Sequence, residues 1–261
     1  DVVFRQNEES VIVKNSQKIN SGDTHLVYSK KFIHCYRDNN EEIFEKASNF
    51  YVNCVKAYGI DNVVLLTPWR NKGTLCVNEF NKHLHERLNS KKSDELTVNI
   101  NNVEFRIGDK VMQTKNNYDM VYSRENGEDG TGIFNGDMGI IESISVRDKC
   151  MNILFDEDKL VEYPFTNLDE LDLAYAITVH KSQGSEFPIV IMPVCSFSPM
   201  LMSRNLFYTA VTRARDMVVL VGSEKTIQNM TMNNQFHQRF TGLTEKLVAV
   251  KKFVAEKEEN S

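Results

Sequence analysis

The middle of this sequence has a different pattern from its two ends. From about residue 90 to residue 165, strand-sized apolar runs are separated at short intervals by Gly, Asn and Asp. This pattern is typical of a small antiparallel barrel. On both sides, helical spacing alternates with short apolar runs such as Val63–Leu66, which indicate buried parallel strands. The sequence therefore predicts one α/β domain with an inserted all-β barrel, with limits at residues 1–92, 93–168 and 169–261.

The individual elements can be placed from apolar spacing and from the residues that end each run. Helices are expected at Glu9–Ile19, Ile43–Tyr58, Thr74–Leu88, Ser203–Ala214 and within Asn233–Phe253. Barrel strands are expected at Leu96–Ile100, Phe105–Thr114, Met138–Val146, Met151–Phe155 and Val161–Tyr163, and α/β strands at Ala174–Val179, Ile189–Val194 and Met217–Gly222. The polar segment Lys115–Gly136 is expected to be a long exposed loop.

Composition excludes several classes of protein. The five cysteines are scattered and form no C-x-x-C pair, which argues against a disulfide framework or a metal site and fits a cytoplasmic protein. There is no run of about 18 apolar residues, so we expect no membrane segment. The net charge of −5 argues against nucleic-acid binding by overall attraction.

Two polar segments stand out against this background. Thr178–Phe187 reads Thr-Val-His-Lys-Ser-Gln-Gly-Ser-Glu-Phe, a Gly-containing turn between apolar runs, which suits contact between backbone or hydroxyl groups and phosphates. Tyr208–Arg215 reads Tyr-Thr-Ala-Val-Thr-Arg-Ala-Arg and ends an apolar helical stretch with two arginines. The segment 203–215 holds three arginines and no acid, which indicates a directed contact with phosphates. The alternative is a basic helix end that interacts with the helix dipole.

The sequence contains no Gly-x-x-x-x-Gly-Lys-Ser/Thr loop, and no expected strand of the α/β segments ends in Asp-Glu in the manner of a magnesium-holding pair. These are the elements that would hold the β- and γ-phosphates of a nucleotide and its Mg²⁺. The chain also begins at Asp1. We therefore expect it to be the C-terminal half of a longer protein, and to be inactive by itself as an ATPase.

Both polar segments resemble the late motifs V and VI of superfamily one DNA helicases, in the RecD-like branch that includes exodeoxyribonuclease V alpha subunits. Phe4-Arg5-Gln6 and Thr67-Pro68-Trp69-Arg70 resemble further elements of that family. Gly108–Gln113 and Phe134–Gly139 look like its SH3-like barrel. The resemblance implies a RecA-like second motor domain of the P-loop NTPase type, mostly a parallel sheet, with an inserted SH3-like barrel of the 2B type that serves as a pin or clamp for DNA.

The resemblance also implies roles for particular residues in a bacterial ATP-dependent DNA helicase. The catalytic candidates are Arg213 and Arg5, because a forked guanidinium stabilises charge on a transferred phosphoryl group. The candidates for binding the nucleotide are Gln6, Gly184, Glu186 and Arg215. The candidates for binding DNA are Thr67, Pro68, Trp69, Arg70, Thr178, His180, Lys181, Ser182 and Gln183. Core packing is the alternative for Trp69.

The implied cofactors are ATP and Mg²⁺, held mainly by a first motor domain that this sequence lacks. The implied partners are single-stranded DNA, duplex junctions, that motor domain, and other recombination or repair subunits. One rival interpretation is a non-catalytic DNA-binding or adaptor module. Another is a nuclease, although the clustered Asp, Glu and His residues of a two-metal site are not evident in the sequence.

Overall fold

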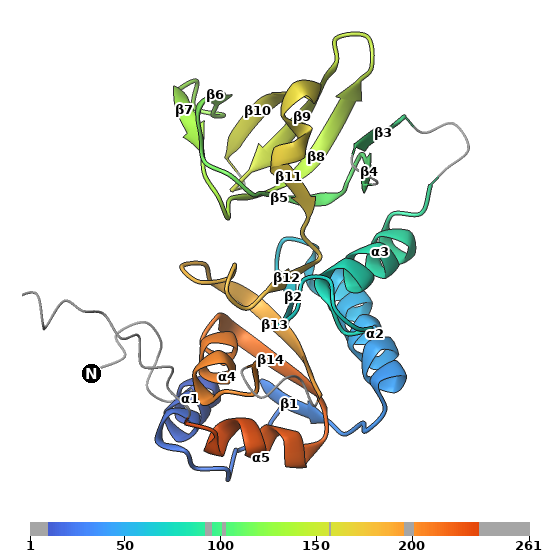
Figure 1. Cartoon of the computed structure of the whole chain (residues 1–261). Coiled ribbons are helices and arrows are strands. Elements are labelled where there is room, and N and C mark those ends of the chain that lie inside the picture. Colours follow the sequence, from blue (N-terminus) through green and yellow to red (C-terminus); the bar gives the residue numbers. More distant parts are fainter. Residues whose placement is uncertain (1–9, 92–95, 101–102, 157, 196–200, 235–261) are drawn as a thin grey trace, which may run out of the picture.

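The computed structural model describes residues 10–91, 96–100, 103–156, 158–195 and 201–234. Figure 1 shows two bodies, an α/β domain and a β-rich domain that is inserted between its strands β2 and β12. The expected helix within 235–253 and the candidate residues Arg5 and Gln6 lie outside the described residues.

The α/β domain is built on a five-stranded parallel sheet. Its strand order is β1 (Phe32–Cys35), β14 (Ala214–Gly222), β13 (Phe187–Val194), β2 (Val63–Thr67) and β12 (Ala176–Thr178). Every residue of β2 is buried, as expected for a central parallel strand covered on both faces. β12 is an edge strand, and the chain enters it directly from the inserted domain. The predicted α/β class with a mostly parallel sheet is therefore confirmed.

Helices cover both faces of this sheet. One face is covered by α1 (Val11–Ser21), α4 (Arg204–Val211) and α5 (Glu224–Met232), and the other by α2 (Asn40–Tyr58) and α3 (Val77–Leu88). Local signals set the helix ends. The Ser10 hydroxyl accepts a hydrogen bond from the Ile12 backbone N–H at the start of α1, and Gly22 ends this helix with a φ of 85°.

The inserted domain is a strongly bent antiparallel sheet with its own core. The strand order is β11 (Leu171–Leu173), β5 (Lys110–Gln113), β8 (Met138–Ser145), β9 (Cys150–Phe155), β10 (Lys159–Pro164), β6 (Asn117–Ser123) and β7 (Asp129–Ile133). A 3-10 helix, η1 (Phe165–Glu170), precedes β11. The hairpin of β3 (Thr97–Ile100) and β4 (Val103–Arg106) lies beside the sheet, with β4 next to β11. Phe105, Phe155 and Tyr163 are fully buried inside this domain, which is called the barrel below.

The structure corrects several of the expected elements. The expected loop at Lys115–Gly136 is largely the hairpin β6–β7. The strand expected at Phe105–Thr114 is two strands, because the chain turns at Gly108 with a φ of 87°. The helix expected at Ser203–Ala214 ends at Val211, and Ala214 already begins β14. β1 was not expected, and β11 pairs with β5 although it follows residue 168. The predicted domain limits stay a prediction.

Candidate functional site

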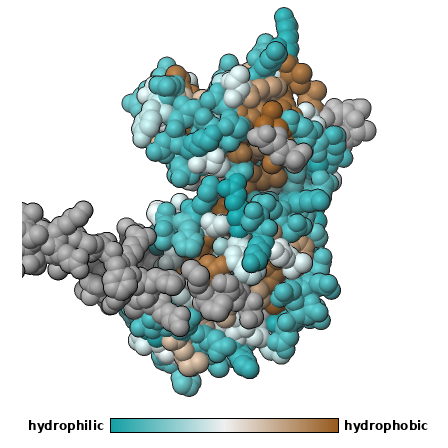
Figure 2. Space-filling model, viewed as in Figure 1, coloured by the Kyte–Doolittle hydropathy of each residue, from teal (hydrophilic) through white to brown (hydrophobic). Residues whose placement is uncertain are grey.

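A cleft with a volume of about 740 Å³ lies beside the edge strand β12, between α3 and the barrel. Figure 2 shows the surface hollowed between the two bodies. The α/β side of the cleft contributes Arg70, Val77, Asn78, Glu79, Asn81, Lys82, His85, Glu86, Ala176, Ile177, Thr178 and Lys181. The barrel side contributes Ile100, Val103, Glu104, Arg106, Met112, Leu168, Asp169, Leu171, Asp172 and Leu173.

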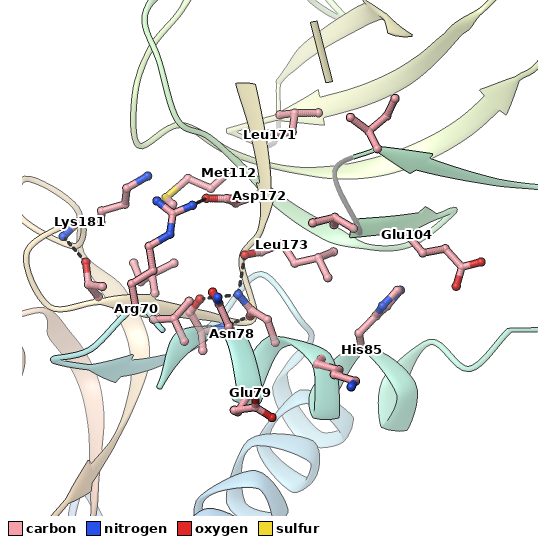
Figure 3. A pocket seen from close by; sticks show the side chains of 18 of the residues that line it. Arg70, Asn78, Glu79, His85, Glu104, Met112, Leu171, Asp172, Leu173 and Lys181 are labelled. Atoms are coloured by element: carbon pink, nitrogen blue, oxygen red, sulfur yellow. Dashed lines mark hydrogen bonds and ion pairs between the residues drawn. The ribbon is translucent and has the colours of Figure 1, made fainter. Parts of the chain in front are cut away.

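Three of the predicted DNA-binding residues meet at one end of this cleft. Arg70 follows β2, whereas Thr178 and Lys181 lie at the end of β12 and in the turn after it (Figure 3). The Arg70 guanidinium donates to the Asp172 carboxylate at 2.8 Å. Burial lowers the pKa of Lys181; nearby Asp172 opposes this shift and Arg70 adds to it. Two cations therefore lie near one carboxylate, and the Thr178 hydroxyl beside them accepts from the Lys181 N–H at 3.2 Å, an arrangement able to take up an anion.

The opposite end of the cleft is different in charge. There Arg106 is paired with Glu86 at 2.6 Å and with Glu104 at 2.5 Å, and the neighbouring Ile100 and Val103 are apolar. The hydrogen bonds from Lys91 and Arg106 lower the pKa of Glu104 to about 2, so its carboxylate stays charged. A phosphate is therefore favoured at the Arg70 end of the cleft and disfavoured at the Glu104 end.

Thr67, Pro68 and Trp69 have a different role from Arg70 in the structure. Thr67 is fully buried and its hydroxyl donates to the Leu75 carbonyl oxygen at 2.5 Å. Pro68 is buried, and the half-buried ring of Trp69 packs against the core cluster between the sheet and the α2–α3 layer. The Trp69 carbonyl accepts from the Val77 N–H at 2.9 Å, and the Arg70 carbonyl from the Asn78 N–H at 3.0 Å. These contacts hold the loop that presents Arg70 against the first turn of α3.

The turn at residues 179–186 is held by its own hydrogen bonds. Ser182 is fully buried, and its hydroxyl donates to the Val179 carbonyl oxygen at 2.7 Å. His180, Gln183 and Glu186 are exposed and do not line the cleft. Gly184 has a φ of 94° and open space where a Cβ would be. Only glycine adopts this backbone conformation readily, and it leaves the peptide accessible to a ligand.

Arg213 lies against this same turn. Its Nη1 donates to the Ser185 carbonyl oxygen at 3.0 Å, while its buried Nε has no hydrogen-bond partner in the described part of the chain. An unsatisfied guanidinium N–H fits an oxygen ligand such as a phosphate. Arg215 is exposed, and its Nε lies 3.2 Å from Asp216. Within the described ranges, no group of three or more His, Cys, Asp or Glu residues is placed to hold a metal ion.

Sequence reasoning missed several residues that shape the site. Asp172 pairs with Arg70 across 102 positions of sequence, and no local pattern marks it. Asn81 on α3 donates to the carbonyl oxygens of Leu173 and Ala176 and accepts from the Ala176 N–H at 2.7 Å. This side-chain amide completes the backbone hydrogen bonds of the strand that returns from the barrel. Its position beside Val77, Phe80 and Leu84, on the buried side of α3, could have indicated a buried polar role, but not its partner.

Comparisons with known proteins agree with this architecture. Residues 80–155 match the family described as the ATP-dependent RecD-like DNA helicase SH3 domain, and residues 173–221 match the UvrD-like helicase C-terminal domain. The chain is 37% identical over 187 residues to the ATP-dependent RecD2 DNA helicase of Deinococcus radiodurans, covering 72% of this chain and 24% of that protein. It is 25% identical over 214 residues to the RecBCD enzyme subunit RecD of Buchnera aphidicola, covering 76% of this chain and 34% of the relative.

Solved structures show the same fold. The Pif1 helicase from Candida albicans aligns with 98% of this chain and 60% of its own, with a TM-score of 0.51 and 13% identity. The Pif1 helicase from Bacteroides, in complex with ADP-AlF3 and ssDNA, aligns with 97% of this chain and 56% of its own, with a TM-score of 0.50 and 17% identity. The chain carries a UvrD-like helicase C-terminal region and a RecD-like SH3 region on a RecA-like fold, and its resemblance to the RecD-like DNA helicases is confirmed.

Proposed function

We propose that this chain is the second motor segment of an ATP-dependent DNA helicase, and that it binds the phosphates of single-stranded DNA at the Arg70 end of the cleft. The observation that carries the proposal is the convergence of Arg70, Thr178 and Lys181 from two separate segments of sequence on one end of one cleft. These groups are suited to phosphates, which fix the register of a nucleic acid without reading its sequence. The relatives named as DNA helicases support the same function.

The Arg70–Asp172 ion pair does not oppose this role. The side chains of Arg70 and Asp172 are 57% and 32% exposed, and ion pairs in such surroundings contribute only about 0–1 kcal/mol. A phosphate oxygen therefore competes with the Asp172 carboxylate for the guanidinium at little cost. In the absence of DNA, Asp172 keeps the Arg70 side chain directed along the cleft mouth.

Arg213 is the proposed contact with the nucleotide. ATP with Mg²⁺ supplies the phosphoryl group. The first motor domain of the helicase is proposed to hold most of the ATP and its Mg²⁺. In this chain, the Ser185 carbonyl orients one arm of the Arg213 guanidinium, and the buried Nε has no hydrogen-bond partner among the described residues. Arg213 then stabilises charge that develops on the transferred group. Arg5, Gln6, Gly184, Glu186 and Arg215 stay candidates for further nucleotide contacts.

The proposed partners are single-stranded DNA, duplex junctions and a first motor domain, with other recombination or repair subunits as further candidates, in the cytoplasm. No helix of the described residues is long and apolar enough to cross a membrane. A non-catalytic DNA-binding or adaptor module is the competing proposal. It predicts binding of single-stranded DNA without DNA-stimulated ATP turnover by the protein that contains this chain.

Arg70→Ala tests the DNA contact. Binding of a fluorescent oligothymidine to the protein that contains this chain is measured by anisotropy over a series of salt concentrations. Each phosphate contact on single-stranded DNA contributes about −0.7 to the slope of log K against log salt. We expect Arg70→Ala to weaken binding and make the slope shallower by about 0.7. Lys56→Ala is the matched control, because Lys56 is an exposed lysine on α2 away from the cleft. Equal slopes for both variants would refute the proposed site.

A further inference from the structure

The barrel contains two copies of one aspartate-closed turn. In residues 106–109 the Asp109 N–H donates to the Arg106 carbonyl at 3.1 Å, and the Arg106 N–H donates to the Asp109 carboxylate at 2.7 Å. In residues 134–137 the Asp137 N–H donates to the Phe134 carbonyl at 3.0 Å, and the Phe134 N–H donates to the Asp137 carboxylate at 2.9 Å. Each turn has a glycine of positive φ before its aspartate. The two turns therefore differ in their surroundings and not in their local construction.

The Asp109 carboxylate makes contacts that leave the barrel, whereas the Asp137 carboxylate accepts from the Phe134 N–H of its own turn. Asp109 is fully buried, and its Oδ1 accepts from the Tyr175 hydroxyl at 2.8 Å and from the Asn89 amide at 2.6 Å. Its Oδ2 lies 3.0 Å from Nε2 of His85. Burial and the neighbouring Asp109 carboxylate raise the pKa of Tyr175, so its phenol stays protonated as a donor. One carboxylate thus accepts hydrogen bonds from the end of α3 and from the segment that enters β12, and it also lies beside the His85 ring on α3.

The residues beside Asp109 add to this junction. The Lys110 ammonium is buried in the α/β domain, where it donates to the carbonyl oxygens of Ile60 at 2.9 Å and Val63 at 3.1 Å. The Arg106 guanidinium donates to the Asn89 carbonyl at 2.6 Å. The chain that enters the barrel is therefore bound to the α/β domain by three charged residues, Arg106 and Asp109 of the turn and Lys110 directly after it.

The chain that leaves the barrel is held by the same helix. Asn81, His85 and Asn89 are spaced four residues apart along α3 and its end, so they share one face of the helix. Asn81 binds the exit segment at Leu173 and Ala176, while His85 and Asn89 face Asp109 in the entry segment. The first turn of α3 also binds the carbonyls of Trp69 and Arg70. The helix α3 thus contacts the segment that enters the barrel, the segment that leaves it and the loop that carries Arg70.

We propose that Asp109 is a positioning residue that locks the barrel against α3 and so fixes the barrel relative to the Arg70 end of the cleft. The expected effect on DNA unwinding rests on the proposed helicase function, whereas the contact between the barrel and α3 does not. Without the lock, Asp172 on β11 would no longer be held beside Arg70. The barrel would then change its orientation relative to the α/β domain about the two segments that enter and leave it. ATP turnover would continue while the barrel no longer held its place on the DNA.

The lock is tested by a distance measurement that needs neither DNA nor ATP. Spin labels are attached at Val146→Cys on the barrel and Tyr58→Cys on α2, both more than half exposed in the native chain. Cys35 and Cys150, which are half-buried, are replaced by serine together with any other accessible cysteine of the protein. Asp109→Asn keeps the shape of the side chain but turns an amide N–H toward existing donors. We expect it to broaden the label distance distribution at least twofold, and Asp137→Asn to leave it unchanged.

Tyr175→Phe is the second variant. It removes a single donor to Asp109, so it serves if Asp109→Asn does not fold, and it should broaden the distribution by less. In the same proteins, we expect Asp109→Asn to lower DNA unwinding at least tenfold while DNA-stimulated ATP turnover stays within threefold. An unchanged distance distribution in both variants would overturn the lock. A broadened distribution with normal unwinding would overturn the positioning role. If the unmodified protein unwinds no DNA, the helicase proposal fails and the distance distributions still decide the lock.

Discussion

Replacement of Lys110 by methionine should change how the free energy of unfolding depends on pH. Lys110 is 2% exposed, and burial lowers its pKa to about 8 from an ordinary value of 10.5, with Asp61 opposing the shift. The folded protein therefore releases this proton at a lower pH than the unfolded chain does. Between pH 8 and 10.5 the unfolded chain binds more protons, so stability rises with pH in that window. Below pH 8 both states hold the proton, and the full cost of burying the charge is present.

The size of the effect follows from the two pKa values. A difference between 10.5 and about 8 corresponds to a cost of about 3 kcal/mol for the buried ammonium. The range from pH 7.5 to pH 9.5 covers only part of the interval between the two pKa values. Over this range, Lys110 should raise the free energy of unfolding of the wild-type chain by about 2 kcal/mol. Methionine has similar length and no charge, so the variant should lack this gain. Other titrating groups contribute equally to both proteins and cancel in the difference.

Urea unfolding measures this difference. Trp69 is the only tryptophan of the sequence and reports on the α/β domain by its fluorescence, and circular dichroism reports on the whole chain. Wild type, Lys110→Met and the exposed-site control Lys56→Met are compared at pH 7.5, 8.5 and 9.5. The control should follow the wild type. A difference between wild type and Lys110→Met that does not change with pH would refute the reasoning. It would mean that the carbonyls of Ile60 and Val63 stabilise the ammonium enough to restore an ordinary pKa.

Substitutions at Arg213 test the catalytic proposal, and substitutions at Gly222 and Gly127 test the packing of the sheet. Arg213→Ala should lower DNA-stimulated ATP turnover of the protein that contains this chain by about 10³-fold or more, with a much smaller change in nucleotide affinity, and Arg213→Lys should recover little because an ammonium cannot fork. Near-normal turnover in steady-state assays would assign Arg213 a structural role and leave Arg5 or Arg215 as the catalytic candidate. Gly222→Ala places a Cβ 1.8 Å from the Val194 carbonyl oxygen and should reduce the free energy of unfolding by about 3 kcal/mol. Gly127→Ala has no neighbour within 4 Å and should cost about 1 kcal/mol from its positive φ alone, so equal losses in urea unfolding would contradict the clash.

The parts of the fold that the sequence predicted are those with strong local signals. The continuous apolar run of β2 and the Gly59 end of α2 are visible without any tertiary information. The β6–β7 hairpin was wrongly expected to be a loop because few of its side chains are buried. Met120 and Ile133 are buried in the barrel core and Tyr122 packs against it, while Tyr118 and Val121 are exposed. A strand at the rim of a barrel has too little apolar alternation to be separated from a loop.

The candidate site was predictable only in part, for a related reason. A motif specifies residue types, but it does not specify which way each side chain points. Thr67 and Ser182 belong to segments that resemble DNA contacts, yet both hydroxyls donate to backbone carbonyls inside the protein. Arg70 and Lys181 do face the cleft. Asp172 carries no local signal, and Asp109 is marked only as part of a segment that resembles the barrel. The partners of both are distant in sequence, and only the folded chain brings them together.

In the proposed function, the DNA and the nucleotide would lie at opposite ends of the strands of the same sheet. Ala176 pairs with Leu65, which pairs with Ile191, so Thr178 and the Arg70 loop lie at the carboxyl ends of the strands. Arg213 lies at the opposite, amino ends, because Ala214 pairs with Phe187, the first residue of β13. The six residues between these levels correspond to about 20 Å along a strand. Residues 179–186 run from Lys181, which lines the cleft, to Ser185, whose carbonyl oxygen accepts from Arg213. The buried Ser182 hydroxyl and successive backbone hydrogen bonds hold this turn together between the two ends. In the proposed function, the turn is therefore the element through which the nucleotide and the DNA act on each other.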